Sequence, residues 1–354
     1  MCNKVNTASI FPGIAALFIL SLLPLFLTAC SRRPDIQQGS GIYFDTAVSM
    51  TVYATGDPKE EVLTQCFSLA SYYEDLFSRT KEGSDIWNIN HAEGKPVSCN
   101  EETITLLTYA LTIADQTEGK IDPTIEPLAA LWDFSSASSA LKSHSLPSED
   151  AIQSALSHVD YHNVVIADDT VTLTDPQAGL DLGFVAKGYI ADRILDYLKT
   201  QENVSGAVIN LGGNVVFYGE KDTKNPFKLG IQKPFADTGT PLATASWKRS
   251  PAHSQASFVT SGIYERYFIY EDQLYHHILD TGTGYPVVPD IQSVTIYSDS
   301  SMEGDALSTT CLILGAKEGL RYIESIDNAE ALFVLVNGEI RTTSGFPAYE
   351  LVKD

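Results

Sequence analysis

The sequence has few cysteines, and no two of them are spaced to bind a metal. Only five of its 354 residues are cysteine, and Cys2 and Cys30 fall in the N-terminal segment, which leaves Cys66, Cys99 and Cys311. An odd number of cysteines without a CxxC motif argues against both a disulfide framework and a structural zinc site. Cys66 and Cys311 stand among apolar residues, so we expect packed thiols.

Basic side chains are also scarce. The chain has 23 Lys and Arg against 45 Asp and Glu, a formal net charge of −22. A protein this acidic is repelled by phosphate backbones and by anionic membrane surfaces. We therefore expect no nucleic-acid partner, and any membrane attachment has to come from something other than charge.

Several common catalytic motifs are absent. The sequence contains no GxSxG, no HExxH, no GxxxxGK[ST] and no GxGxxG between a strand and a helix. These absences argue against α/β-hydrolase, zincin, P-loop and Rossmann chemistry. No internal repeat or low-complexity tract divides the chain, which favours a single domain over residues 41–354.

The longest apolar run lies at the N-terminus, from Ile14 to Phe26, and Pro24 interrupts it. It is shorter than the about 20 residues that a membrane span needs, so it predicts a secretory signal peptide over residues 1–29. The run ends in Leu27-Thr28-Ala29-Cys30, which resembles the lipobox of bacterial lipoproteins. That resemblance implies a lipidated Cys30 and a polar linker over residues 30–40. It also implies an extracytoplasmic protein, anchored to a bacterial membrane on the periplasmic side or at the cell surface; the alternative is an ordinary signal peptide with a chance cysteine.

Hydrophobic periodicity predicts the main elements. Alternation predicts a strand over 42–54, and apolar residues at steps of three and four predict helices over 58–79 and 101–117, with Ser148 as the cap of a shorter helix. Turn residues predict hairpins over 163–174, 206–218 and 264–279, and another around Asn337-Gly338. Strand pairs separated by helices, without a βαβ alternation, predict an α+β domain with a mixed or antiparallel sheet.

Three oxygen-bearing side chains lie at helical spacing in SMEGDALSTT, residues 301–310. Asp305, Ser308 and Thr309 share a helix face, because residues three and four apart are neighbours there. One carboxylate with hydroxyl oxygens suits Mg²⁺, which takes the rest of its ligands from water and substrate phosphates. The alternative is that Asp305 caps the helix and the hydroxyls bond back to helix carbonyls, and the segment by itself favours that alternative.

Two glycine-containing segments are candidate ligand loops. GLDLGFVAKGYIADRI (179–194) runs from a short strand through Gly183 into a helix with Lys187 near its start. A helix N-terminus beside a lysine suits a phosphate, although the same pattern fits close packing at Gly183 and Gly188 with a solvated lysine. INLGGNVVFYG (209–219) is either a tight hairpin or a loop against a ligand.

Three further segments carry chemistry that their own sequence leaves open. YHHILDTGTGYP (275–286) places His276 and His277 in a strand on opposite faces, so that one can face the core and the other a site. GKIDPTIEPLAALWDF (119–134) is a rigid loop leading into a helix, and VTSGIYERYF (259–268) has small hydroxyls at a strand end.

Taken together and in this order, these segments resemble the ApbE-like family of FAD:protein FMN transferases. The resemblance runs from about residue 42 to the end and also includes FSRTKEGSDIWNIN (77–90). It implies an ApbE-like fold of strands and packed helices, with FAD in a cleft beside a Mg²⁺ site. The chain departs from the family pattern at Thr281, where proline is common, at Gly304, where alanine is common, and at Thr80, where many relatives have an aromatic residue.

The resemblance also implies roles for individual residues. Asp305, Thr309 and the main-chain carbonyl of Phe184 match the metal ligands, and Ser308 is a further candidate oxygen. His277 matches the catalytic histidine, and His277 or Asp280 would act as the base. The positions that match residues lining the flavin are Met50, Lys120, Ile121, Asp122, Asp181, Lys187 and the backbone at Leu279.

The implied reaction cleaves the pyrophosphate of FAD, transfers FMN to a Ser or Thr hydroxyl of an acceptor flavoprotein and releases AMP. Mg²⁺ would neutralise charge on the phosphate oxygens. Acceptors in the family are typically subunits of membrane redox complexes or secreted flavoproteins. Two alternatives remain: transfer to water, which makes the protein an FAD pyrophosphatase, and a flavin-binding lipoprotein without catalysis.

Overall fold

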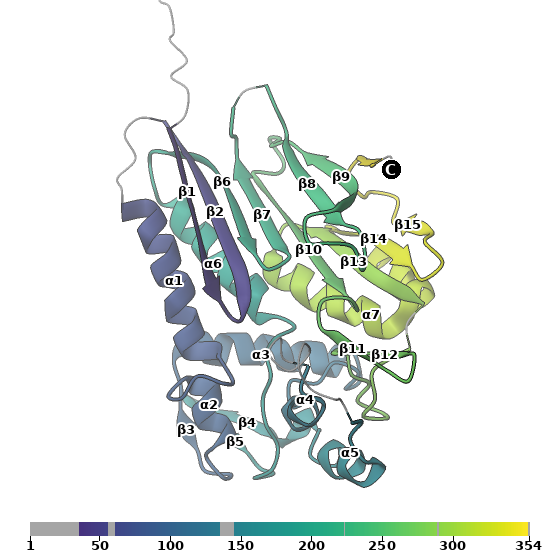
Figure 1. The fold of residues 1–354 in the computed structure, drawn as a ribbon. Helices are drawn as coiled ribbons and strands as arrows, with labels where there is room; N and C mark the ends of the chain where they lie inside the picture. The colour runs from purple at the N-terminus through teal and green to yellow at the C-terminus, as the bar shows by residue number, and fades with distance from the viewer. Residues whose placement is uncertain (1–34, 56–60, 135–144, 223, 289, 353–354) are drawn as a thin grey trace, which may run out of the picture. The chain divides into compact units, whose positions relative to one another are not determined.

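A computed structural model describes residues 35–55, 61–134, 145–222, 224–288 and 290–352. Eight of the strands form one sheet in the order β1-β2-β6-β7-β10-β13-β14-β15, and every pairing in it is antiparallel (Figure 1). Its strands are β1 (Asp35–Tyr43), β2 (Thr46–Ala54), β6 (Val204–Leu211), β7 (Asn214–Gly219), β10 (Gln255–Gly262), β13 (Ile291–Ser298), β14 (Ala329–Leu335) and β15 (Ile340–Thr342). The fold class is therefore α+β as predicted, with the antiparallel alternative confirmed.

Smaller sheets and the helices complete the unit Arg33–Asp354. The smaller sheets are β3-β5-β4 (Val97–Ser98, Thr170–Leu173, Val164–Ala167), β16-β9-β8 (Tyr349–Leu351, Pro241–Trp247, Phe227–Gln232) and β11-β12 (Tyr267–Tyr270, Gln273–His276). The helices are α1 (Glu61–Phe77), α2 (Asp85–Asn90), α3 (Glu101–Gln116), α4 (Glu126–Trp132), α5 (Glu149–Leu156), the 3-10 turn η1 (Tyr161–Asn163), α6 (Ala186–Lys199) and α7 (Ser301–Glu324).

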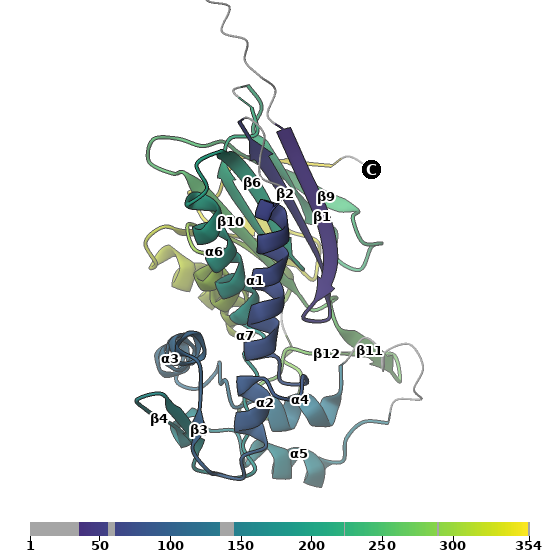
Figure 2. The same ribbon diagram turned by 90° about the vertical axis from the view of Figure 1, so that its left-hand side faces the viewer.

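The two faces of the large sheet are covered differently. Helices α1, α6 and α7 cover one face, and the sheet of β8, β9 and β16 covers the other (Figure 2). Alternation along β7 shows why: Val216 packs with α1 and α6, whereas Phe217 packs with Phe227 and Trp247 of the small sheet. Helices α2 to α5 gather at one end of the large sheet, below it in Figure 1.

The beginning of the domain differs from the prediction. Residues 42–54 are not one strand: β1 and β2 form a hairpin that turns at Phe44 and Asp45, both of which have positive φ. The predicted linker is also wrong from Asp35 onward, because residues 35–40 pair with β2. The alternation misled because β1 is an edge strand in which Ile42 is 73% exposed and faces away from the core, whereas Gly39, Gly41 and Tyr43 form the half-buried face.

Most other local predictions are confirmed. The hairpins turn at Asp168-Asp169, Gly212-Gly213, Glu271-Asp272 and Asn337-Gly338, α3 matches 101–117, and the Ser148 hydroxyl caps α5 by accepting from the Ala151 N–H. Of the predicted helix 58–79, residues 61–77 are helical, and Pro58 lies outside the described residues. The expected short strand before Gly183 is a single bridge between Gly179 and Ile125.

The cysteines of the described chain are buried free thiols, as expected for Cys66 and Cys311. Burial raises the pKa of Cys66 and Cys99 to about 12, so these thiols stay protonated and unreactive. The predicted signal peptide, Cys30 and its lipobox lie outside the described residues. Among the helices that are described, none is long and apolar enough to cross a membrane.

Helix α7 begins at a cap that the sequence did not identify. Ser300 is the N-cap, so the reading of Asp305 as the helix cap is wrong; Asp305 sits in the second turn. Asp192 of α6 supports this start from outside, because its carboxylate accepts the N–H groups of Ser301 and Met302 at 2.9 and 3.0 Å. These hydrogen bonds connect α6 to the N-terminal turn of α7.

Candidate metal and flavin site

The site starts from a close contact between α6 and α7 at Gly188. A Cβ atom on this residue would collide with the main-chain carbonyl of Ser301, so only glycine allows the helices to approach this far. The approach brings the Gly188 N–H within 2.9 Å of Oδ2 of Asp305. Gly188 therefore serves close packing, and its N–H also orients the carboxylate.

Asp305 is the buried carboxylate of the site. Its side chain is 2% exposed and comes from the second turn of α7. One oxygen, Oδ2, is held by Gly188, while the other, Oδ1, has the Lys187 ammonium at 3.7 Å and no hydrogen bond among the described residues. A buried carboxylate with one uncommitted oxygen is suited to a cation.

The carbonyl of Phe184 is left open by the same hydrogen bond. In a regular helix the N–H of Gly188 would donate to this carbonyl, but it donates to Asp305 instead. The neighbouring carbonyls of Leu182 and Val185 are paired with the N–H groups of Ala186 and Tyr189, whereas no described group donates to Phe184. The predicted main-chain ligand is thus an oxygen without a described partner, one helical turn before the Gly188 N–H that holds the carboxylate.

Ser308 and Thr309 differ in how their hydroxyls are used. Ser308 donates to the carbonyl of Asp305 at 2.9 Å and lies 2.7 Å from the Ser261 hydroxyl, from which it therefore accepts. The Thr309 hydroxyl makes no hydrogen bond within the described chain and is partly exposed, one helical turn from Asp305. Of the two, Thr309 offers the free oxygen, and Ser308 completes the helix turn.

These donors fit a small hard cation. They comprise one carboxylate oxygen, one main-chain carbonyl and one threonine hydroxyl, a mixed oxygen set that leaves positions for water or phosphate. No group of three or more His, Cys, Asp or Glu suited to a metal occurs in the described ranges. The fit to Mg²⁺ therefore depends on a main-chain carbonyl and a hydroxyl as well as on the single carboxylate.

Lys187 occupies the position next to these oxygens. Its Nζ donates to the carbonyl of Gly183 at 3.3 Å and faces Oδ1 of Asp305 at 3.7 Å. The side chain is 26% exposed, so the ammonium is accessible from the solvent side. It is the second residue of α6, where the helix dipole adds positive potential, and this combination favours an anionic ligand such as a phosphate.

The 119–122 loop reaches the same place through its apolar residue. Ile121 packs against Phe184 and Ala306, so the loop, the α6 turn and α7 share one small cluster. Asp122 is used internally: its carboxylate accepts from the N–H and hydroxyl of Thr124 and from the N–H of Tyr161. Burial raises the pKa of Asp122, and the structure gives its side chain a role in holding the loop.

Thr281 ties this loop to the histidine loop. Its hydroxyl donates to the carbonyl of Gly119 at 2.8 Å, a bond that the family's usual proline could not make. The departure at Gly304 also has a local reason, because a Cβ there would lie 2.9 Å from Cγ2 of Val259 on β10. Thr80 is exposed and bonds within its own turn.

His276 and His277 have opposite surroundings, as predicted, although only His276 lies in β12. His276 is 2% exposed; its Nε2–H donates to the carbonyl of Val287 and its Nδ1 accepts from the Ile278 N–H. His277 is partly exposed, and its Nδ1 lies 3.2 Å from the carbonyl of Arg266. A carbonyl only accepts, so Nδ1 carries the proton and Nε2 is the free basic nitrogen.

Both rings are neutral at physiological pH. Burial lowers the pKa of His276 to about 4, and burial together with the nearby Arg266 lowers the pKa of His277 to about 3. Nε2 of His277 is consequently unprotonated over the whole neutral range and able to accept a proton, although a pKa this low makes it a weak base. The neutral ring cannot serve as a cation for phosphate.

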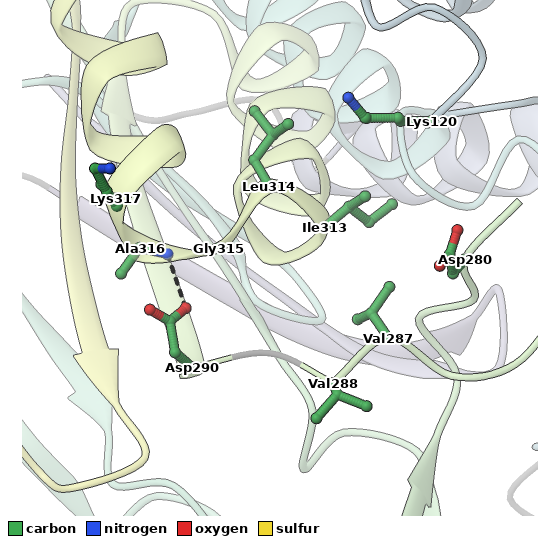
Figure 3. Close-up of a pocket in the computed structure, with 10 residues that line it drawn as sticks. All are labelled: Lys120, Asp280, Val287, Val288, Asp290, Ile313, Leu314, Gly315, Ala316 and Lys317. Atoms are coloured by element: carbon green, nitrogen blue, oxygen red, sulfur yellow. Dashed lines mark hydrogen bonds between the residues drawn. The ribbon is translucent and has the colours of Figure 1, made fainter. Parts of the chain in front are cut away.

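Lys120 and Asp280 line a cavity of about 450 Å³. They border one side of it, and Asp290 and Lys317 the other, with Ile313 of α7 in between (Figure 3). Oδ1 of Asp280 accepts the Gly282 N–H at 2.8 Å, which stabilises the turn after the histidines. The cavity adjoins α7 on both sides of Gly315, where positive φ kinks the helix and Asp290 caps its second half.

The remaining predicted flavin residues have mainly structural contacts. Met50 (2% exposed) and Leu279 (6% exposed) are packed in separate clusters of the core, so a flavin contact for them stays a prediction. Asp181 accepts the Gly183 N–H at 2.8 Å and pairs with Arg79 at 3.1 Å. Arg79 also faces Glu126 at 3.6 Å, a bridge that the sequence did not suggest.

Glu265 is a further charged group that the sequence left unassigned. It follows β10 in the segment VTSGIYERYF, and its side chain is solvent-exposed although protein surrounds it closely. This desolvation raises the pKa of Glu265 to about 7, against the opposing effects of Lys187 and Arg266, and Asp305 raises it further. The carboxylate is thus close enough to Lys187 and Asp305 for their charges to act on it.

The arrangement of open oxygens beside a lysine suits an anionic ligand held together with a hard cation. The chain belongs to the ApbE family, whose sequence profile matches residues 44–333. The FAD:protein FMN transferase of Klebsiella pneumoniae is 35% identical over 80% of this chain and 85% of its own length. That of Treponema pallidum is 30% identical over 90% of both chains.

Solved structures agree with this assignment. The ApbE protein of Thermotoga maritima superposes with a TM-score of 0.78 and 30% identity, and covers 88% of this chain and 98% of its own. The flavinyl transferase ApbE of Pseudomonas stutzeri, in its apo form, has a TM-score of 0.73 at 23% identity, with 88% and 94% coverage. The fold and the family predicted from the sequence are therefore confirmed.

Proposed function

We propose that the protein is an FAD:protein FMN transferase that moves FMN from FAD to a Ser or Thr hydroxyl of an acceptor flavoprotein and releases AMP. Its relatives of 35% and 30% identity carry this name, and the match spans most of each chain. The observation that carries the proposal is the hydrogen bond from the Gly188 N–H to Oδ2 of Asp305. It leaves two oxygens without a hydrogen-bond donor among the described residues, Oδ1 of Asp305 and the Phe184 carbonyl.

Asp305, Thr309 and the Phe184 carbonyl would hold Mg²⁺. When bound, the cation neutralises charge that develops on the phosphate oxygens as the pyrophosphate is cleaved. Lys187, at the start of α6, would bind the same phosphates from the helix side. The residues thus orient the diphosphate for attack at the phosphorus of the FMN half.

His277 would take the proton of the acceptor hydroxyl. Its Nε2 is unprotonated because Nδ1 donates to the Arg266 carbonyl, and its low pKa keeps it so. Asp280 is the second candidate base, but one of its oxygens is already committed to the Gly282 N–H. The AMP half leaves with the electrons of the broken P–O bond.

The decisive experiment measures AMP release and FMN transfer separately. Purified protein is incubated with FAD, Mg²⁺ and a candidate acceptor, AMP is quantified, and the acceptor band is examined for flavin fluorescence. Asp305→Ala is expected to abolish Mg²⁺-dependent AMP release, whereas Asp196→Ala, at the far end of α6, should not; full activity of Asp305→Ala would refute the metal assignment. AMP without a fluorescent acceptor would favour the pyrophosphatase, and unchanged FAD would favour a flavin-binding protein.

We further propose that Cys30 anchors the protein to the outer side of a bacterial membrane through a lipid. The LTAC sequence after an apolar run supports this placement. Wild-type protein is expected in the detergent phase after phase partitioning, and Cys30→Ser in the aqueous phase. If both proteins stay in the detergent phase, the lipid anchor is wrong. With the protein anchored as proposed, its acceptors would be extracytoplasmic flavoproteins, such as subunits of membrane redox complexes.

A further inference from the structure

The contacts of Lys187 resemble those of a bound cation. Its ammonium is shared between the main-chain carbonyl of Gly183 (3.3 Å) and Oδ1 of Asp305 (3.7 Å), the oxygen that Gly188 leaves open. A carbonyl and a carboxylate are also the kinds of donor that a Mg²⁺ ion would use here. The ammonium therefore neutralises the carboxylate that the metal needs.

We propose that Lys187 is a built-in competitor for the metal, whose displacement by Mg²⁺ turns its ammonium toward the substrate diphosphate. This inference rests on the proposed metal site. It adds a role for Lys187, which is not one of the proposed metal ligands. Two cations cannot share Oδ1 at contact distance without repulsion, so metal binding has to release the ammonium. Lys187 would then be a positioning residue that links the metal to the diphosphate.

The geometry allows the ammonium to move. The Lys187 side chain is 26% exposed, whereas Asp305 is 2% exposed, so the lysine side chain reaches solvent and the carboxylate does not. The bond to Gly183 is local, from residue 187 to residue 183, and its loss would not disturb the helix contact at Gly188. The Glu265 carboxylate, on which the Lys187 charge acts, would favour the released ammonium.

Two consequences distinguish this role from simple phosphate binding. Without the ammonium, the empty carboxylate should bind a divalent cation more tightly, because no internal charge competes for it. In a variant without the ammonium, the metal and the diphosphate should also increase each other's affinity by a smaller factor than in wild type, because part of this coupling depends on Lys187. A lysine that only contacts phosphate predicts no gain in metal affinity in the absence of substrate.

The test titrates Mn²⁺ into the metal-free, FAD-free protein and measures the concentration of unbound Mn²⁺ by electron paramagnetic resonance. Lys187→Met is expected to bind Mn²⁺ at least about threefold more tightly than wild type, the scale of one partly exposed ion pair. The control is Lys199→Met, which removes the same charge from the other end of α6, about 18 Å along the axis. Lys199 pairs with Asp196, so its variant should match wild type.

The outcomes separate the inference from the proposed function. Equal or weaker Mn²⁺ binding by Lys187→Met, with wild type binding normally, overturns the competitor role and leaves the metal site standing. Absence of Mn²⁺ binding in wild type overturns both. A gain in affinity cannot arise from a damaged fold, since misfolding would weaken the site. A second titration with ADP as the diphosphate probe should show that Mn²⁺ raises ADP affinity by a smaller factor in Lys187→Met than in wild type.

Discussion

The main-chain N–H of Gly188 donates to Oδ2 of Asp305 at 2.9 Å, across the contact between α6 and α7. This single bond fixes the carboxylate, leaves its second oxygen open and deprives the Phe184 carbonyl of its helical partner. It joins a packing position to a binding position. Changes at Gly188 should therefore affect stability and metal binding together.

Gly188→Ala is expected to lower the free energy of unfolding by about 1–3 kcal/mol, because the added Cβ collides with the Ser301 carbonyl and forces the helices apart. Mn²⁺ affinity should fall in the folded variant. Urea denaturation and Mn²⁺ titration measure the two effects. Gly230→Ala is the control, since a Cβ on Gly230 meets only Pro241 at an ordinary 3.5 Å. Equal behaviour of the two variants would contradict the close-contact argument.

Thr281→Val should raise KM for FAD and leave the fold nearly intact. The substitution removes the hydroxyl that joins the histidine loop to the carbonyl of Gly119, a bond worth about 1 kcal/mol. Steady-state kinetics of AMP release would show the change as a roughly fivefold higher KM. Thr281→Ser keeps the hydroxyl and should stay close to wild type; a serine variant as impaired as the valine variant would rule out the loop tie.

His276 predicts a loss of stability in acid. Its pKa is about 4 in the folded state and about 6.5 when unfolded, so its contribution is complete above pH 6.5 and is lost as pH falls toward 4. Between pH 7 and pH 5 the loss should be about 2 kcal/mol, measured by urea denaturation at both values. His276→Gln should lack this component, whereas His162→Gln, at an exposed site, should retain it. An unchanged pH dependence in His276→Gln would contradict a buried neutral ring.

Glu265 predicts that metal binding strengthens as pH rises through about 7. Its pKa is raised to that value by desolvation, so ionisation adds a negative charge near Asp305 as the pH rises through this value. Mn²⁺ affinity of wild type should rise severalfold from pH 6 to pH 8. Glu265→Gln should flatten this rise, while Glu271→Gln, in the exposed β11–β12 turn, should not. A flat wild-type profile would show that Glu265 does not sense the site.

The sequence predicted much of this fold because its signals were local. Asn337-Gly338 and Gly212-Gly213 mark hairpins through their own backbone preferences, and Ser148 caps its helix within one turn. The β1–β2 hairpin was missed because Phe44 and Asp45 carry no such mark and the half-buried face of β1 consists mainly of Gly39, Gly41 and Tyr43, without an apolar alternation. The Asp192 cap on α7 was missed because it joins residues more than one hundred positions apart.

The site shows the same division. Asp305 and Thr309 stand out by their spacing, and the family resemblance assigns them a role. The distinction between Ser308 and Thr309 could not be read from the sequence, because it depends on Ser261 of β10, which reaches Ser308 only after folding. Glu265 was missed for a similar reason, since its pKa depends on how the cleft surrounds it.

The open carbonyl of Phe184 has a consequence for variation at the site. Because the donor belongs to the main chain, replacing the side chain at 184 leaves the oxygen in place, and many residues can stand there without loss of the ligand. The neighbouring Gly188 has the opposite property, since it supplies no ligand atom and yet tolerates no side chain. Among inactive variants of this protein, substitutions at position 184 should be rare and substitutions at position 188 frequent.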